Sequence, residues 1–148
     1  GGAAFDASVH CAIMCWPVID PLGRYHYAQK HVGAADAKLA KMADEWVHCH
    51  NAYWPDEAAM AEGNPSLALQ RGEAVRMPPV LYLQGTDDLA HPAPLRDRFI
   101  ADYRKAGGRV ELHLFKGVGE AFITNDPNSA AAREAIERII EFVRREMR

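Results

Sequence analysis

The sequence of 148 residues predicts an α/β fold, a parallel sheet of about three strands with flanking helices. Three apolar segments, at about 9–16, 79–83 and 110–115, have the length and composition of strands. Helical patterns follow the second and third of them, over about 94–106 and 129–147. This strand–helix–strand–helix order implies parallel strands joined by right-handed crossovers.

The first third of the chain combines a strand with a helical segment. Residues 9–16 form a nearly continuous apolar run that ends at Pro17, which is typical of a strand buried on both faces. Residues 17–34 are rich in proline, glycine and aromatic residues, and we expect an ordered loop there. Helices are expected over 35–50 and 56–62. Together these residues predict a helical, cap-like insertion over about 22–62.

Glycine, proline and capping residues punctuate the rest of the chain. Gly63 is a helix stop signal, and the Asn-Pro-Ser sequence at 64–66 predicts a turn. The second strand leaves through a tight loop at 85–88, and the next helix begins at about Pro94. The third strand alternates apolar and polar residues at its start, so we expect it to be less buried than the other two. Ser129 is the expected N-cap of the last helix.

Composition excludes several classes of partner. The formal net charge is -3 and no run of lysine or arginine stands out, so a nucleic-acid partner is not expected. No apolar stretch approaches the roughly 20 residues needed to span a bilayer. The chain starts without the pattern of a signal peptide, and its three cysteines do not suggest a disulfide framework. These features favour a cytoplasmic location.

Three segments carry a resemblance to a known family. They read CWPVIDP at 15–21, PPVLYLQGTDDLAHP at 78–92 and VELHLFKGVGEAF at 110–122. They resemble the YPVxDP, PPVLxxHGxxDxxVP and GxxHGF motifs that follow the sixth, seventh and eighth strands of α/β-hydrolases in the esterase and lipase branch. The order and spacing of the set make the resemblance specific. It implies that residues 1–148 are the C-terminal part of an α/β-hydrolase domain.

The resemblance implies hydrolysis of small-molecule carboxylic esters by a serine, acid and histidine triad. Asp88, three positions after Gly85, matches the acid, whereas its neighbour Asp87 does not. A loop-capping role, common for aspartate after glycine, is the alternative for Asp88. The position expected for the histidine is occupied by Glu120, and a carboxylate cannot supply the chemistry of an imidazole.

The nucleophile of such a triad has no counterpart in this chain. No G-x-S-x-G elbow occurs, and none of the serines, Ser8, Ser66 and Ser129, lies between glycines. Family members place the elbow after their fifth strand, so we expect it upstream and expect this chain alone to be inactive. The alternative is a non-catalytic relative that acts as a binding or scaffolding protein.

Other candidate residues follow from their positions. Trp16 and Asp20 end the first strand, at the edge where α/β sheets bind ligands, and are candidates for substrate binding. No cofactor is implied. Metal binding at His48-Cys49-His50 is not expected, because the two histidines of a helix spaced in this way point to different faces. Convergence of Asp88, Glu120 and His91 on a cation is a weaker alternative. Further aromatic residues suited either to core packing or to an acyl or aryl pocket are Trp46, Tyr53 and Trp54.

The first strand also predicts a partner. In the family's strand order this strand pairs with the fifth strand, which the chain lacks. An unpaired apolar edge pairs readily with another chain. We therefore expect a homodimer joined near residues 9–16, or association with a missing N-terminal half.

Overall fold

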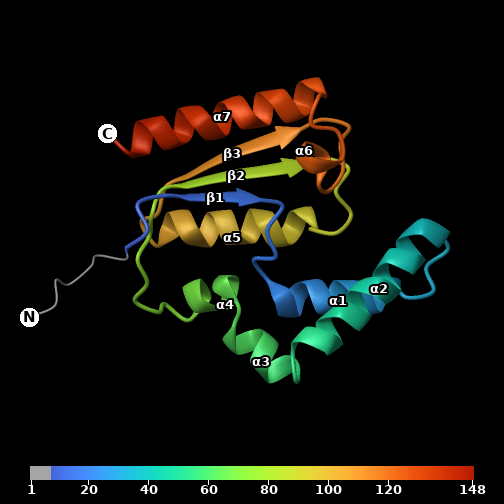
Figure 1. Cartoon of the computed structure of the whole chain (residues 1–148). Helices are drawn as coiled ribbons and strands as arrows, with labels where there is room; N and C mark the ends of the chain where they lie inside the picture. Colours follow the sequence, from blue (N-terminus) through green and yellow to red (C-terminus); the bar gives the residue numbers. More distant parts are fainter. Residues whose placement is uncertain (1–7) are drawn as a thin grey trace, which may run out of the picture.

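The computed structural model describes residues 8–148 and contains one parallel sheet. Its strands are β1 (Ala12–Cys15), β2 (Val80–Gly85) and β3 (Val110–Phe115), in the order β1-β2-β3. Helices α5 (Ala93–Lys105) and α7 (Ala130–Glu146) cover opposite faces of the sheet (Figure 1). The predicted α/β class, with three parallel strands and flanking helices, is confirmed.

The central strand β2 is buried at every residue and divides the core into two layers. Because successive side chains of a strand point to opposite faces, Val80 and Tyr82 pack with Phe99 on the α5 side. Leu81 and Leu83 pack with Phe142 on the α7 side. Burial of these side chains on both faces stabilises the sheet, at about 25 cal/mol for each Å² of apolar surface removed from water.

Strand β1 lies at an edge of the sheet and pairs only with β2. The prediction that this strand is buried on both faces is wrong, since none of its four residues is fully buried and Ile13 is 38% exposed. The strand is also shorter than the predicted run. Strand β3 is less buried than β2, as predicted, but not less buried than β1. The edge position of β1 agrees with the expectation drawn from the family's strand order.

Four helices connect β1 to β2: α1 (Pro21–His31), α2 (Ala37–Tyr53), α3 (Glu57–Glu62) and α4 (Pro65–Gln70). The predictions of a loop over 17–34 and a turn over 64–66 are wrong. Helices α1 and α4 each begin with a proline that follows a side-chain N-cap, Asp20 and Asn64 respectively. Both arrangements are ordinary helix starts, because proline lacks the N–H that the first turn leaves unbonded.

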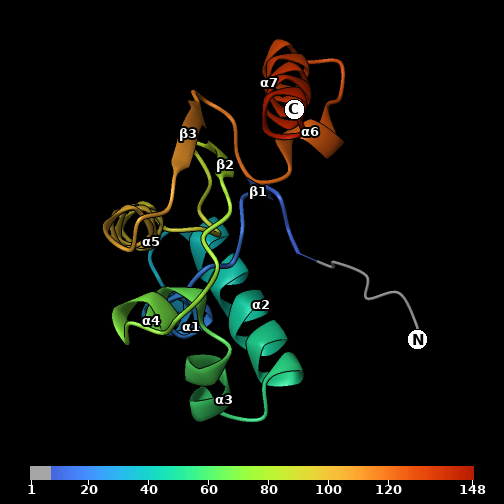
Figure 2. The same ribbon diagram turned by 90° about the vertical axis from the view of Figure 1, so that its left-hand side faces the viewer.

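The helical insertion, defined here as α1 to α3, lies on the α5 side of the sheet (Figure 2). Helices α1 and α2 pack on each other through Ala28, Ala43 and Trp46. Ala90, from the loop after β2, joins the same cluster. The insertion therefore contacts the carboxyl end of the sheet. Among the described residues, no helix is long and apolar enough to cross a membrane.

Candidate active site

The loops that follow β2 and β3 lie side by side at the carboxyl end of the sheet. The backbone N–H of Asp87 donates to Val118 O at 3.0 Å, and the N–H of Gly117 donates to the Thr86 hydroxyl at 2.9 Å. A Cβ atom at Gly85 would lie 2.0 Å from Val118 O, so only glycine fits there. Hydrogen bonds thus join the loop after β2, which carries Asp88 and is called the acid loop here, to the loop after β3, which carries Glu120.

Asp88 is buried in the acid loop and accepts three hydrogen bonds. Its Oδ1 accepts from the backbone N–H groups of Ala90 and His91, at 2.9 and 3.2 Å. Its Oδ2 accepts from His91 Nδ1 at 2.9 Å. All three donors belong to the same loop, so the Asp88 carboxylate has a loop-capping role. Asp87 is exposed and accepts only from the Thr86 hydroxyl.

His91 is the histidine that the structure pairs with Asp88. It is 6% exposed, and its carbonyl oxygen accepts from Gln84 Nε2 at 2.6 Å. With Nδ1 donating to a carboxylate, Nε2 becomes the basic nitrogen, as in a catalytic triad. However, His91 lines a cavity of only about 10 Å³, which is roughly the space of one water molecule.

Glu120 is exposed in the loop after β3. The next residue, Ala121, has a φ of 59° and precedes the short helix α6 (Phe122–Asn125). This left-handed conformation favours glycine, and glycine stands at the corresponding place of the motif that the sequence resembles. The positive φ of Ala121 thus falls where the motif has its glycine, and the role of Glu120 stays a prediction.

Arg24 of α1 is brought to the same end of the sheet by the insertion. Its Nε donates to Ala90 O at 2.7 Å, and its guanidinium carbon lies 5.3 Å from the centre of the Trp46 ring. Burial lowers the pKa of Arg24, while the negative charges of Glu120 and Asp88 act in the opposite direction. Arg24 was missed from the sequence, because an isolated arginine in a predicted loop carries no signal of its position.

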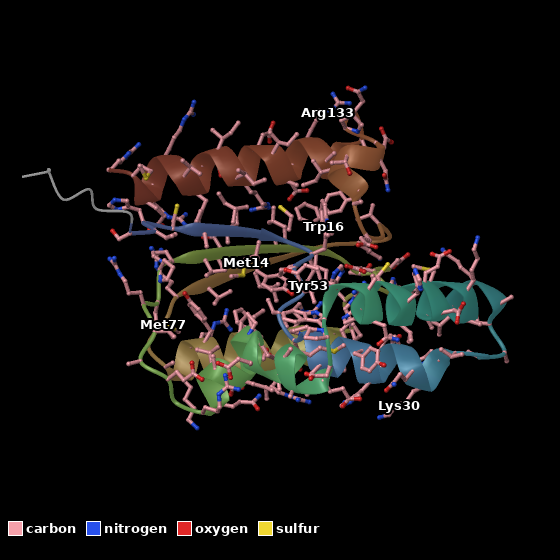
Figure 3. The ribbon with its side chains drawn as sticks, turned by 60° about the horizontal axis from the view of Figure 1, so that its bottom comes forward. Met14, Trp16, Lys30, Tyr53, Met77 and Arg133 are labelled. Carbon is pink, nitrogen blue, oxygen red and sulfur yellow. The ribbon has the colours of Figure 1, made fainter. Side chains whose placement is uncertain are left out.

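The two residues predicted to bind substrate lie in different surroundings. Trp16 is half-buried on the α7 side, where its ring centre lies 5.5 Å from that of Phe122 (Figure 3). Asp20 is buried, and its Oδ1 accepts from the backbone N–H of Gly23 and from Asn64 Nδ2, each at 2.7 Å. The structure thus gives Asp20 a role at the start of α1, and substrate binding by either residue stays a prediction.

A larger pocket opens between α1 and the C-terminal end of α2, and we call it the α1–α2 pocket. Its volume is about 320 Å³, and the residues that define it are Val18, Pro21, Arg24, Cys49, His50, Tyr53, Trp54, Gly63 and Pro65. Tyr53, labelled in Figure 3, is the last residue of α2. Burial lowers the pKa of His50, and its Nδ1 lies 2.8 Å from Trp46 O. This pocket is large enough for a small organic ligand.

The residues weighed as metal ligands do not form a three-ligand group, although Asp88 and His91 are in contact. Within residues 8–148, no group of three histidine, cysteine, aspartate or glutamate side chains is arranged to hold a metal ion. His50 is buried whereas His48 is exposed, so the two side chains lie in different environments.

The family of the chain follows from a comparison of its sequence with family models. The model of the dienelactone hydrolase family matches residues 38–147. The chain belongs to the dienelactone hydrolase family. A comparison with curated proteins found no match.

Solved structures resemble the chain in their fold. An inhibited complex of esterase B from Lactobacillus rhamnosis superposes with a TM-score of 0.61 at 11% identity, over 93% of this chain and 40% of that one. Esterase 2 of Thermogutta terrifontis, phosphoramylated by tabun, gives a TM-score of 0.57 at 20% identity, over 91% of this chain and 40% of that one. These likenesses show the α/β esterase fold. The chain spans about 40% of the length of these structures.

Proposed function

We propose that this member of the dienelactone hydrolase family is the C-terminal part of a carboxylic ester hydrolase. In this proposal Asp88 is the acid of the triad, and the serine nucleophile is supplied by residues outside the chain. The main support is the joined pair of loops at the carboxyl end of the sheet, with buried Asp88 in one and Glu120 in the other. The family and the esterase fold of the structural neighbours point to the same chemistry.

The division of roles follows from the chemistry of ester hydrolysis. The histidine of a triad takes the proton of the nucleophile, and the acid orients and stabilises the imidazolium. Asp88 is suited to the second task, because loop hydrogen bonds hold its carboxylate in one position. Glu120 is not suited to the first task, since a glutamate provides no imidazole. The chain by itself is therefore inactive in this proposal.

The assay begins with the 148-residue chain and p-nitrophenyl butyrate. We expect no rate above a buffer blank. The polypeptide encoded by the whole reading frame is then assayed with Asp88→Asn and, as a matched control, Asp87→Asn. Hydrolysis that Asp88→Asn lowers and Asp87→Asn leaves unchanged is the expected result. Equal rates for all three proteins would overturn the assignment of Asp88.

A second candidate function, a non-catalytic binding or scaffolding protein, is favoured by Glu120 and by the pairing of Asp88 with His91. The Glu120→His variant of the whole polypeptide separates the two. If only the variant hydrolyses the ester, the natural protein is a binding relative. If the natural polypeptide already hydrolyses the ester through Asp88, the second candidate is excluded.

We also propose that the free edge of β1 pairs with a second copy of the chain or with the N-terminal part of the fold. Support comes from exposed Ile13 and from an apolar groove of about 260 Å³ beside Met14 and Leu69. Light scattering and hydrogen exchange test this proposal. A monomer whose β1 amides exchange freely would contradict the dimer.

A cytoplasmic location is part of the same proposal. All three cysteines are free, which suits a reducing compartment. Fractionation of cells that express the protein tests it, and recovery outside the cytoplasmic fraction would contradict it.

A further inference from the structure

We propose that the α1–α2 pocket binds the aryl group of an uncharged aryl ester, with Arg24 donating to the ester carbonyl oxygen. This inference rests on the proposed function and adds a substrate class to it. It is drawn from three features of the pocket: its aromatic wall, the unused donors of Arg24, and the charges that surround this arginine.

The aromatic wall is formed by Tyr53 and Trp54. Their ring centres are 4.9 Å apart and the rings are nearly perpendicular, at 79°. Tyr53 is 78% exposed, so most of its ring is available to a ligand. The Trp54 ring lies directly against Gly63, where a Cβ atom would come within 2.5 Å of Cη2. Glycine at this position allows the indole to form the wall, and edge-to-face packing suits a further aromatic ring.

The pocket is also lined by Arg24, a half-buried cation with unused hydrogen-bonding capacity. Its Nε is committed to Ala90 O, and stacking on Trp46 restrains the plane of the guanidinium. Within residues 8–148, the two terminal nitrogens of Arg24 make no hydrogen bond. Because a guanidinium has five N–H groups, four donors remain for a ligand with an oxygen acceptor.

The surrounding charges favour a neutral acceptor over an anion. Glu120 and Asp88 lie within electrostatic range of Arg24 and offset its charge. His50, the other titratable cation of the pocket, is buried and its pKa is lowered, so it is neutral at pH 7. A negatively charged ligand would therefore gain little from Arg24 and would be repelled by both carboxylates. A carbonyl oxygen uses the free donors without that repulsion.

Arg24, which lines the pocket, is linked through Ala90 to Asp88. Ala90, to which Arg24 is bonded, also donates its backbone N–H to Asp88 Oδ1. A carbonyl group bound by Arg24 would thus lie next to the acid loop. The aryl group would occupy the groove between α1 and α2, where about 320 Å³ accommodates one ring and a short substituent.

Binding is measured on the 148-residue chain with acetanilide, an aryl amide that serine esterases do not readily consume. Cys49 is exposed and lines the pocket, so its alkylation by iodoacetamide, followed by mass spectrometry, reports occupancy. The half-buried Cys11 and Cys15 lie outside the pocket and serve as internal references. We expect acetanilide to slow the labelling of Cys49 saturably, and N-cyclohexylacetamide and sodium benzoate to do so about tenfold less effectively.

Two pairs of variants identify the walls. Tyr53→Ala is expected to raise the acetanilide concentration needed for protection about tenfold, whereas Tyr53→Phe keeps the ring and the protection. Gly63→Ala displaces the Trp54 ring and is expected to weaken protection, whereas Glu62→Ala, just outside the pocket, is not. Circular dichroism confirms that each variant is folded, and exposed Tyr53 tolerates substitution without loss of the core.

Several outcomes would overturn the inference. These are no protection of Cys49 by acetanilide, equal protection by the cyclohexyl compound, stronger protection by benzoate, or protection that Tyr53→Ala leaves unchanged. Because no hydrolysis occurs in this experiment, its failure removes the aryl pocket and leaves ester hydrolysis to be tested separately. Protection by acetanilide in a protein without esterase activity would conversely retain the binding site alone.

Discussion

The sheet and the helical insertion are packed around different apolar clusters. Strand β2 is buried on both faces by apolar side chains of α5 and α7. The insertion has its own apolar cluster around Ala28, Ala43 and Trp46, which Ala90 of the loop after β2 joins. Arg24 Nε also donates to Ala90 O, so this loop is where the insertion is attached. The insertion can therefore define a pocket without adding side chains to the two clusters that bury β2.

The largest expected effect is in the sheet. Phe142→Ala removes a ring that is 1% exposed beneath β2 and should lower the free energy of unfolding by about 3–5 kcal/mol. The exposed Ile140 on the same helix is the matched control, and Ile140→Ala should change stability by about 0.5 kcal/mol or less. Urea titration measures both. Equal effects would show that α7 is not anchored through Phe142.

The junction of the two regions is tested at Asp88. Asp88→Ala leaves two buried backbone N–H groups and the His91 imidazole without their acceptor, and should cost about 1–3 kcal/mol of unfolding free energy. Asp87→Ala, on the exposed neighbour, should be nearly neutral. A neutral Asp88→Ala in the same urea titration would mean that the loop does not depend on this carboxylate.

The attachment of the insertion is tested at Asp20. Asp20→Ala removes the N-cap of α1 and the acceptor of Asn64 Nδ2, with an expected loss of about 1–2 kcal/mol. Asp36→Ala removes only an exposed cap, that of α2, and should cost less. Hydrogen exchange should show faster opening of α1 amides than of β2 amides in the Asp20 variant. Uniform acceleration in both regions would refute a separately attached insertion.

The insertion should also respond to acid through His50. Burial lowers the pKa of His50 in the folded protein. As the pH falls below the ordinary pKa of about 6.5, the imidazole is therefore protonated in the unfolded chain before it is protonated in the folded protein. The free energy of unfolding should therefore decrease as pH falls from about 6.5 toward the lower folded pKa. His50→Gln should reduce this slope, and His48→Gln, at an exposed position, should not. Thermal unfolding between pH 7 and pH 5 measures it, and identical slopes would exclude His50 as a cause.

The smallest effect is expected in the loop after β3. Ala121 has a positive φ, so Ala121→Gly should relieve strain and raise stability by up to about 1 kcal/mol. Ala130→Gly, at the start of α7, should lower stability instead. A destabilising Ala121→Gly, seen by urea titration, would show that the left-handed conformation is not costly here.

The sequence determined the sheet layer because its signals are local and periodic. The apolar segment of β2, the apolar stripe of α7 and the Ser129 cap predicted elements that the structure contains. The Asp56 and Gly63 boundaries of α3 followed from capping chemistry in the same way. The positions of Asp88 and Glu120 in neighbouring loops followed from strand order, since the carboxyl ends of parallel strands meet at one edge.

Only the tertiary structure decided the rest, because those features depend on the path of the chain and on contacts between distant residues. Ile13 is exposed, although the apolar sequence of β1 is typical of a buried strand. The pairing of Asp88 with His91 depends on the path of one loop, and the bond from Arg24 to Ala90 spans 66 residues. Helix α1 had a readable start at Asp20-Pro21, but the surrounding proline, glycine and aromatic residues concealed it. Asp88 and Glu120 were therefore visible in the sequence, while Arg24 and the partners of these side chains were set by packing.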